Sequence, residues 1–191
     1  MADLDLAIDR NGDDGHYSFS FGFGSSPGYC GNVAGGAVDF WCVFRGATGL
    51  QGKTIASATI TLTRNSAGSG TCAYKVRGMA ADNVTPPTDG TTYLALSWTT
   101  ANVTGTTSNP ASITITITSI VQELANRAGL ANDRIGFQVA DNGSAAGNYM
   151  ENACFEGVPQ EARISITFAA ANKQGAAKTQ SLKLHRRRLV A

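Results

Sequence analysis

The segment that decides the fold is Ile55-Ala56-Ser57-Ala58-Thr59-Ile60-Thr61-Leu62-Thr63, in which small or apolar residues alternate with hydroxyl residues. Successive side chains of a β-strand point to opposite faces. We therefore expect Ala56, Ala58, Ile60 and Leu62 on one face and the hydroxyl residues on the other. A strand with one buried face and one wet face is typical of an antiparallel sheet.

The same alternation recurs along the chain, and turns rich in Gly, Asn and Asp separate its repeats. In 16–23, the aromatic residues Tyr17, Phe19, Phe21 and Phe23 are all expected to face inward. The strands that the pattern predicts are 3–8, 16–23, 38–45, 55–64, 71–79, 94–98, 112–118, 134–140 and 161–168. Many short strands without a long helix predict an all-β sandwich or barrel.

One short helix is expected after the strand at 112–118. Ser119 and Gln122 have the spacing of a capping box, and Gly129 is a candidate for the residue that stops the helix. The apolar residues between them, such as Leu124, would face the core. A helix of about ten residues at this place would close one end of the sandwich.

The composition changes after Phe168, where the last expected strand ends. Residues 169–191 hold six Lys or Arg and no acidic residue, so the net charge of +1 divides into +6 on this tail and −5 on residues 1–168. We therefore expect a sandwich domain at 1–168 and a basic C-terminal tail at 169–191.

Three interpretations of the tail are open. It is a solubilising extension, a phosphate-contacting segment, or a docking segment whose leucines enter pockets while its arginines face an acidic rim. The acidic body argues against nucleic acid as a partner. We favour docking, through Leu182, Leu184, Arg186, Arg187, Arg188 and Leu189.

Several segments, taken in order over about 16–168, resemble the DNRLRE-type jelly-roll domain. They are Phe40-Trp41-Cys42-Val43-Phe44-Arg45, 54–62, the "TW" segment Leu96-Ser97-Trp98-Thr99-Thr100-Ala101, 115–124 and 162–168. The resemblance implies an antiparallel jelly-roll sandwich. It also implies an adhesive, carbohydrate-binding or structural role, as in extracellular bacterial and archaeal proteins and phage virion proteins. The family has no agreed catalytic residues to transfer.

No arrangement of residues predicts an enzyme. The only histidines are His16 and His185, and neither lies near a Gly-x-Ser-x-Gly nucleophile motif. No cofactor is expected apart from a structural calcium ion, for which the oxygen-rich segment 9–15 is a candidate. The calcium candidates are Asp9, Asn11, Asp13 and Asp14. A hairpin turn rich in Asp and Gly explains the same residues and is favoured.

Sugar binding uses exposed aromatic rings, and the candidates here are Trp41, Trp98 and Tyr149. Trp41 lies opposite Phe40 in the alternation, so it either faces outward or packs in a second layer, against the tail or a neighbouring subunit. The second arrangement is favoured.

The four cysteines Cys30, Cys42, Cys72 and Cys154 lack the spacing of a zinc site. They are expected either as buried thiols or, in an extracellular particle, as late disulfides of unknown connectivity.

The sequence begins without a basic and apolar leader and has no apolar run of about 18 residues. We therefore expect synthesis in a host cytoplasm, no membrane partner, and later incorporation into a virion. The expected function is that of a non-enzymatic structural protein of a phage-like virion, such as a head decoration, collar or tail-associated protein. Its partners would be other virion proteins or copies of itself. The alternative is a carbohydrate-binding adhesive module that contacts cell-surface glycan.

Overall fold

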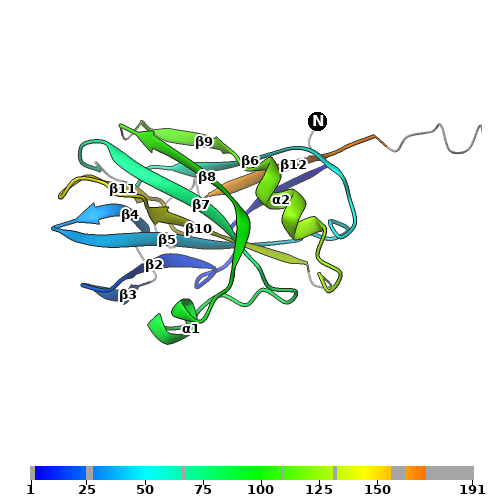
Figure 1. Cartoon of the computed structure of the whole chain (residues 1–191), viewed down its shortest axis with the longest axis horizontal. Coiled ribbons are helices and arrows are strands. Elements are labelled where there is room, and N and C mark those ends of the chain that lie inside the picture. The colour runs from blue at the N-terminus through cyan, green and yellow to red at the C-terminus, as the bar shows by residue number, and fades with distance from the viewer. Residues whose placement is uncertain are drawn as a thin grey trace, which may run out of the picture.

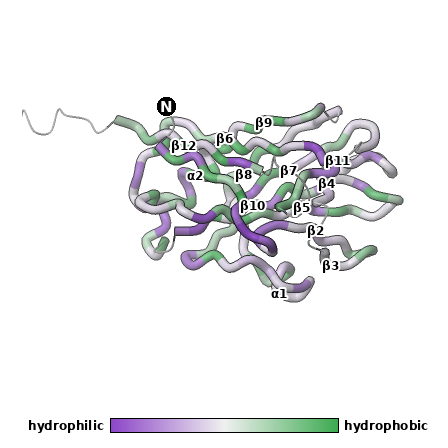
Figure 2. The backbone as a smooth tube through the Cα atoms, turned by 180° about the vertical axis from the view of Figure 1, so that it is seen from behind, coloured by the Kyte–Doolittle hydropathy of each residue, from purple (hydrophilic) through white to green (hydrophobic). Residues whose placement is uncertain are grey.

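Two antiparallel sheets pack face to face in the computed structural model, which describes residues 3–24, 28–65, 68–108, 110–130, 133–155 and 162–170 (Figure 1). The first sheet holds, in spatial order, β1 (Leu4–Ala7), β12 (Arg163–Phe168), β6 (Ile55–Thr63) and β9 (Ser112–Thr116). The second is built on β5 (Gly36–Arg45), β10 (Arg134–Asp141), β7 (Cys72–Met79) and β8 (Trp98–Thr107). The hydrophobic stretches of the chain lie largely on the strands of these two layers (Figure 2).

The pairing of these strands is that of a jelly roll. The first strand pairs with the last, β1 with β12. Moving inward along the chain, β5 pairs with β10, β6 pairs with β9, and β7 pairs with β8, all antiparallel. Such nested pairing arises when one long antiparallel ribbon rolls up into two facing sheets. The predicted antiparallel jelly-roll sandwich is confirmed.

Four further strands extend the second sheet around β5. β2 (Asp14–Ser18) pairs with the middle of β5 and carries β3 (Gly22–Gly24) on its other edge. β4 (Gly28–Val33) pairs with the first residues of β5 and with β11 (Tyr149–Asn152). These strands lie at the end of the molecule opposite the end of β12 (Figure 1).

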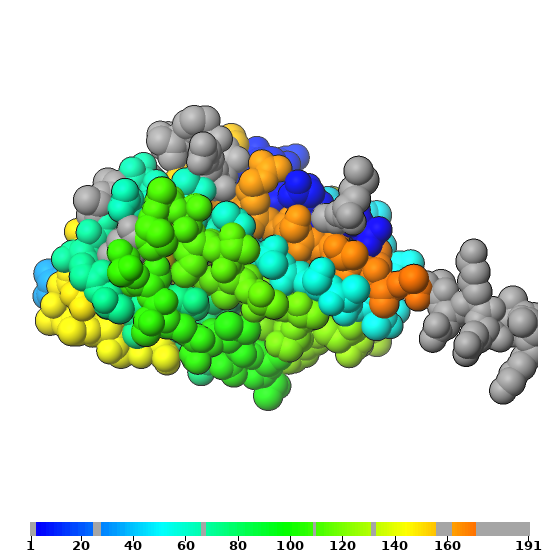
Figure 3. All heavy atoms as spheres, turned by 90° about the horizontal axis from the view of Figure 1, so that it is seen from above, coloured from blue at the N-terminus to red at the C-terminus, as the bar shows by residue number. Residues whose placement is uncertain are grey.

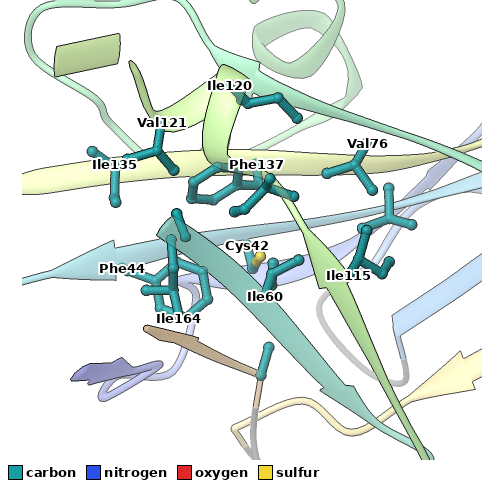
Figure 4. Close-up of a cluster of buried hydrophobic side chains, with 14 of the residues drawn as sticks. Cys42, Phe44, Ile60, Val76, Ile115, Ile120, Val121, Ile135, Phe137 and Ile164 are labelled. Atoms are coloured by element: carbon teal, nitrogen blue, oxygen red, sulfur yellow. The ribbon is translucent and has the colours of Figure 1, made fainter. Parts of the chain in front are cut away.

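The main core lies between the sheets and follows the predicted alternation (Figure 4). Phe44 from β5 meets Phe137 from β10 edge to face at 6.0 Å between ring centroids. Ile60 and Ile164 are cross-strand neighbours and are fully buried. One detail of the prediction is wrong, because the pairing skips Ala56, so that Ile55 is buried in its place and Ala56 is exposed. A β-bulge of this kind shifts the alternation by one residue.

A second cluster covers the outer face of the second sheet, because β5 and β10 are buried on both faces. Its members are Trp41, Val43, Met79, Val84 and Tyr93. The segment after β7 folds across them and includes the helix α1 (Gly90–Leu94), capped by the Asp89 carboxylate, which accepts from Thr92 N at 2.7 Å. The predicted strand 94–98 is therefore wrong, since residues 90–94 form a helix and the strand begins at Trp98.

The predicted single strand at 16–23 is also wrong. β2 ends at Ser18, the chain turns, and β3 begins at Gly22, which has a φ of +84°. Phe19 and Phe21 lie in this turn with 83% and 55% of their surface exposed. The alternation fails here because Phe19 and Phe21 lie in the hairpin turn that joins β2 to β3, and the chain has reversed its direction before Phe23.

The predicted helix exists as α2 (Thr118–Ala125), but its capping residues differ from the prediction. Its N-cap is Ile117 without a side-chain cap, and it ends at the C-cap Asn126 rather than at Gly129. Instead of capping the helix with Ser119, the Gln122 side chain accepts from Ile55 N at 2.8 Å and donates to Lys53 O at 3.0 Å. Tertiary hydrogen bonds to the start of β6 have replaced the local ones.

β12 ends at Phe168, as predicted. Ala169 N still donates to Thr54 O at 2.8 Å. The predicted docking residues at 182–189 lie outside the described part of the chain. None of the helices among the described residues has the length and apolar character to cross a membrane.

Ile164→Ala is expected to lower the free energy of unfolding by about 2–5 kcal/mol, because the truncation leaves a cavity in the main core. Ser165→Ala on the same strand, whose side chain points to the opposite face, should change it by less than about 0.5 kcal/mol. Urea unfolding of both variants measures the difference. Equal effects of the two variants would contradict the register of β12.

Candidate functional site

A concave feature with an aromatic lining lies at the end of the sandwich formed by β2–β5. It is a cleft of about 250 Å³ lined by His16, Phe21, Tyr29, Val33 and Val38. Its residues come from three strands and one turn that the extension of the second sheet brings together. We call this feature the aromatic cleft.

Two aromatic rings, His16 and Tyr29, line the aromatic cleft, and a third, Tyr149, packs against Tyr29. The ring centroids of His16 and Tyr29 are 5.4 Å apart, and those of Tyr29 and Tyr149 are 5.8 Å apart, both in edge-to-face geometry. The imidazole of His16 packs directly against the backbone of Gly24. A side chain at residue 24 would prevent this, because its Cβ would lie 2.5 Å from His16 Cε1. The sequence alternation in β4 sends Cys30 into the core and leaves Tyr29 on the cleft side.

Polar groups border these three rings. Glu151 lies opposite Tyr29 in the β4–β11 pair, and its Oε1 accepts from Asn65 Nδ2 at 2.9 Å. The pKa of Tyr29 is raised, first by burial and then by the negative charge of Glu151. The hydroxyl of Tyr29, like that of an ordinary tyrosine, can donate a hydrogen bond at neutral pH.

The turn beside the aromatic cleft adds exposed apolar surface. Phe19 and Phe21 project from it, and Phe19 is held edge to face by Tyr17 at 5.4 Å. Exposed large apolar side chains that gather at one place mark binding surfaces more often than isolated ones do. The cleft and the turn together form a surface suited to binding an amphipathic ligand or partner.

A second group of polar side chains lies on the outer face of the second sheet, where hydrogen bonds join its members beside the second cluster. Asp39 Oδ2 accepts from Tyr93 Oη at 2.9 Å and from Gln138 Nε2 at 2.8 Å, while Gln138 Oε1 accepts from Arg77 Nε at 2.9 Å. Burial raises the pKa of Asp39, and these hydrogen bonds oppose the shift. The network satisfies polar groups that the second cluster buries.

The predicted sugar-contact residues do not form one exposed surface, although Trp98 packs against the cluster that contains Trp41. Trp41 has 1% of its surface exposed, so its assignment as an exposed platform is wrong. It packs in a second layer, as favoured, but against this chain's own Phe23 at 5.7 Å and the segment after β7. Trp98 is half-buried beneath the Arg77 guanidinium, whose Cζ lies 5.1 Å from the ring centroid. Tyr149 alone lies next to the aromatic cleft, where its ring packs against the cleft residue Tyr29.

The predicted calcium candidates have other partners. The buried Asp13 carboxylate accepts from Arg45 Nε at 2.5 Å and Nη2 at 2.7 Å. Asp14 Oδ2 accepts from Phe155 N at 3.1 Å, and Asp9 and Asn11 are exposed. Within the described ranges, no three His, Cys, Asp or Glu side chains are grouped so as to hold a metal ion.

Sequence reasoning missed His16, Phe21 and Tyr29 as site residues. The signal for Phe21 was its place before Gly22 and Gly24, which indicates a hairpin, but the alternating phenylalanines were assigned to one strand. His16 and Tyr29 have no local signal, since only the pairing of β2, β4 and β5 makes them neighbours.

A scan against models of known protein families and a search of curated proteins each found no match to this chain. The resemblance to the DNRLRE-type domain therefore rests on the residues quoted for it in the sequence.

Proposed function

We propose that this chain is a non-enzymatic structural module of a phage-like virion, attached to the particle through residues 169–191. The observation that supports the proposal is that the aromatic cleft and the end of β12 lie at opposite ends of the sandwich. The aromatic cleft lies on the β2–β5 end, and β12 leaves the opposite end (Figure 1). The space-filling view agrees, with the segment around β11 and the end of β12 at opposite ends (Figure 3).

Charge supports attachment through the tail. Residues 169–191 carry a net charge of +6, and residues 1–168 carry −5. The tail is therefore electrostatically complementary to the acidic body of a neighbouring copy or of a similar virion protein. Leucines on both sides of the three arginines supply apolar groups that can be buried in the contact. A module anchored in this way holds its cleft away from the particle.

Deletion of 171–191 is expected to leave a folded sandwich that no longer joins the particle, because every described strand precedes residue 171. The measurement is cosedimentation with particles in a density gradient of the lysate in which the chain is produced. The full chain should move with the particles, and the truncated chain should stay in the soluble fraction with an unchanged melting temperature.

Two matched variants separate the forces in the tail. The first replaces Arg186, Arg187 and Arg188 with Gln, and the second replaces Leu182, Leu184 and Leu189 with Ser. Loss of cosedimentation only in the first indicates charge, and only in the second indicates apolar docking. Retained cosedimentation of the truncated chain, or its absence for the full chain, would contradict the proposal.

A second candidate function, carbohydrate binding, is favoured by the aromatic cleft. Sugar rings pack on aromatic faces, while their hydroxyls need nearby polar groups. The row His16–Tyr29–Tyr149 with Glu151 beside it supplies both kinds of contact. This function is compatible with a virion module that contacts cell-surface glycan.

On a glycan array, Tyr29→Ala and Tyr149→Ala are each expected to weaken binding about 10-fold, which corresponds to about 1.4 kcal/mol. Leu94→Ala, on exposed α1 outside the cleft, is the control and should bind as the unaltered chain does. An array without signal for the unaltered chain would eliminate carbohydrate binding but leave the attachment proposal standing.

A further inference from the structure

Two of the four cysteines lie side by side in the core. Cys30 on β4 and Cys72 on β7 are both fully buried, and their Sγ atoms are 3.9 Å apart although they are 42 positions apart in the sequence. The Cys72 thiol also donates to the Cys30 carbonyl oxygen at 3.4 Å. None of the four cysteines is part of a disulfide in this structure.

The backbone around this pair permits a closer approach. A disulfide requires the two sulfurs at about 2.05 Å, so they must move together by roughly 2 Å. Gly31, next to Cys30, has a φ of +121°, and a Cβ there would lie 3.1 Å from Cys72 Sγ. Because glycine has no side chain, the backbone of β4 lies directly against the sulfur of Cys72. β4 pairs with β5 only through residues 31–33, and its other edge pairs with the short edge strand β11, so β4 and β11 can shift together while few bonds to β5 are disturbed.

The surroundings of Cys72 favour its thiolate. Ser144 Oγ donates to Cys72 Sγ at 3.8 Å. Hydrogen bonds from Cys30 and from Ser144 lower the pKa of Cys72 against the effect of burial, whereas the pKa of Cys30 is raised well above its usual value. Since the thiolate is the nucleophile in thiol–disulfide exchange, Cys72 is the residue that reacts first.

We propose that Cys30 and Cys72 are an oxidation site, and that they form an intrachain disulfide when the protein leaves a reducing compartment for an oxidising one. The oxidant is a small disulfide such as oxidised glutathione, which reaches the buried Cys72 sulfur during local opening of the β4–β11 edge of the sheet. The Cys72 thiolate attacks it, forming a mixed disulfide and releasing one glutathione thiolate. The Cys30 thiolate then attacks Cys72 Sγ and releases the second. The two protein thiols lose two protons and two electrons, which leave on two molecules of reduced glutathione.

The cross-link would restrain the movement of β4, which forms one side of the aromatic cleft. Tyr29, which lines the cleft, precedes Cys30 directly, and β4 lies at the side of the sheet rather than among the eight jelly-roll strands. Joining β4 to β7 removes its freedom to separate from the sandwich. This inference is independent of the proposed virion function, because it depends only on the two thiols and their surroundings.

The test compares the full chain kept reduced with the same chain incubated in oxidised glutathione. Peptide mapping of the oxidised protein is expected to show one linked pair that contains Cys30 and Cys72, with Cys42 and Cys154 still open to alkylation after unfolding. The melting temperature should rise by about 5–15 °C, as expected for a cross-link in a domain of this size, and return when dithiothreitol is added.

Single-cysteine variants provide the matched controls. Cys154→Ser should keep the oxidation-dependent rise in melting temperature, and Cys72→Ser should lose it. If Cys72→Ser does not fold, the peptide map of the unaltered chain still decides the question. Four alkylatable cysteines after oxidation, or a linkage that uses Cys42 or Cys154, would overturn the proposal.

Discussion

Trp41→Ala is expected to lower the free energy of unfolding by about 3–5 kcal/mol, the usual range for truncating a buried Trp. The indole has 1% of its surface exposed and stacks on Phe23 at 5.7 Å. Its removal would leave a cavity between the outer face of β5 and the segment that crosses it, where Met79 and Val84 also pack. Urea unfolding, with the slope of the transition compared between variants, measures the effect.

Trp41→Phe is the informative companion variant. The indole Nε1 has no hydrogen-bond partner among the described residues, and an unsatisfied buried donor carries a desolvation cost of about 1–3 kcal/mol. Phe loses volume but also removes this donor, so we expect a cost below about 2 kcal/mol. Trp98→Ala, at a half-buried ring, should also cost less than Trp41→Ala. A Trp41→Ala effect under about 0.5 kcal/mol would mean that the ring is at the surface.

Arg45→Met is expected to destabilise the protein by about 3–5 kcal/mol, because it leaves the buried Asp13 carboxylate without its bidentate partner. Asp13 has 1% of its surface exposed, whereas the second acidic neighbour of Arg45, Asp9, is exposed and contributes little. The measurement is the change in free energy of unfolding at neutral pH.

A double-mutant cycle isolates the pair. Arg45→Met combined with Asp13→Asn should cost less than the sum of the two single changes, because the double variant leaves no unpaired buried charge. Calcium provides a further control, since the loop that holds Asp13 was a calcium candidate. Millimolar calcium should leave the melting temperature of the unaltered chain unchanged, and a clear rise would show that the ion competes with Arg45 for Asp13.

These two predictions of lost stability concern residues whose roles were only partly visible in the sequence. Trp41 had two possible environments because a strand alternation identifies opposite faces but not what covers them. Asp13 had two possible roles, as a calcium ligand or as part of a hairpin turn, and its pairing with Arg45 was not foreseen. In both cases the deciding group is far away in the chain.

The amino-acid sequence by itself determined the all-β class, most of the strands, the position of α2 and the end of β12 at Phe168. These features follow from the local alternation of apolar and polar residues, as in β6 and β12. Only the tertiary structure decided the environment of Trp41, the hairpin that exposes Phe19 and Phe21, the assembly of the aromatic cleft and the meeting of Cys30 with Cys72. Each of these depends on strand pairings between distant segments. The stability of such a pairing comes from packing against side chains on the partner strand, and the local sequence pattern does not identify that partner.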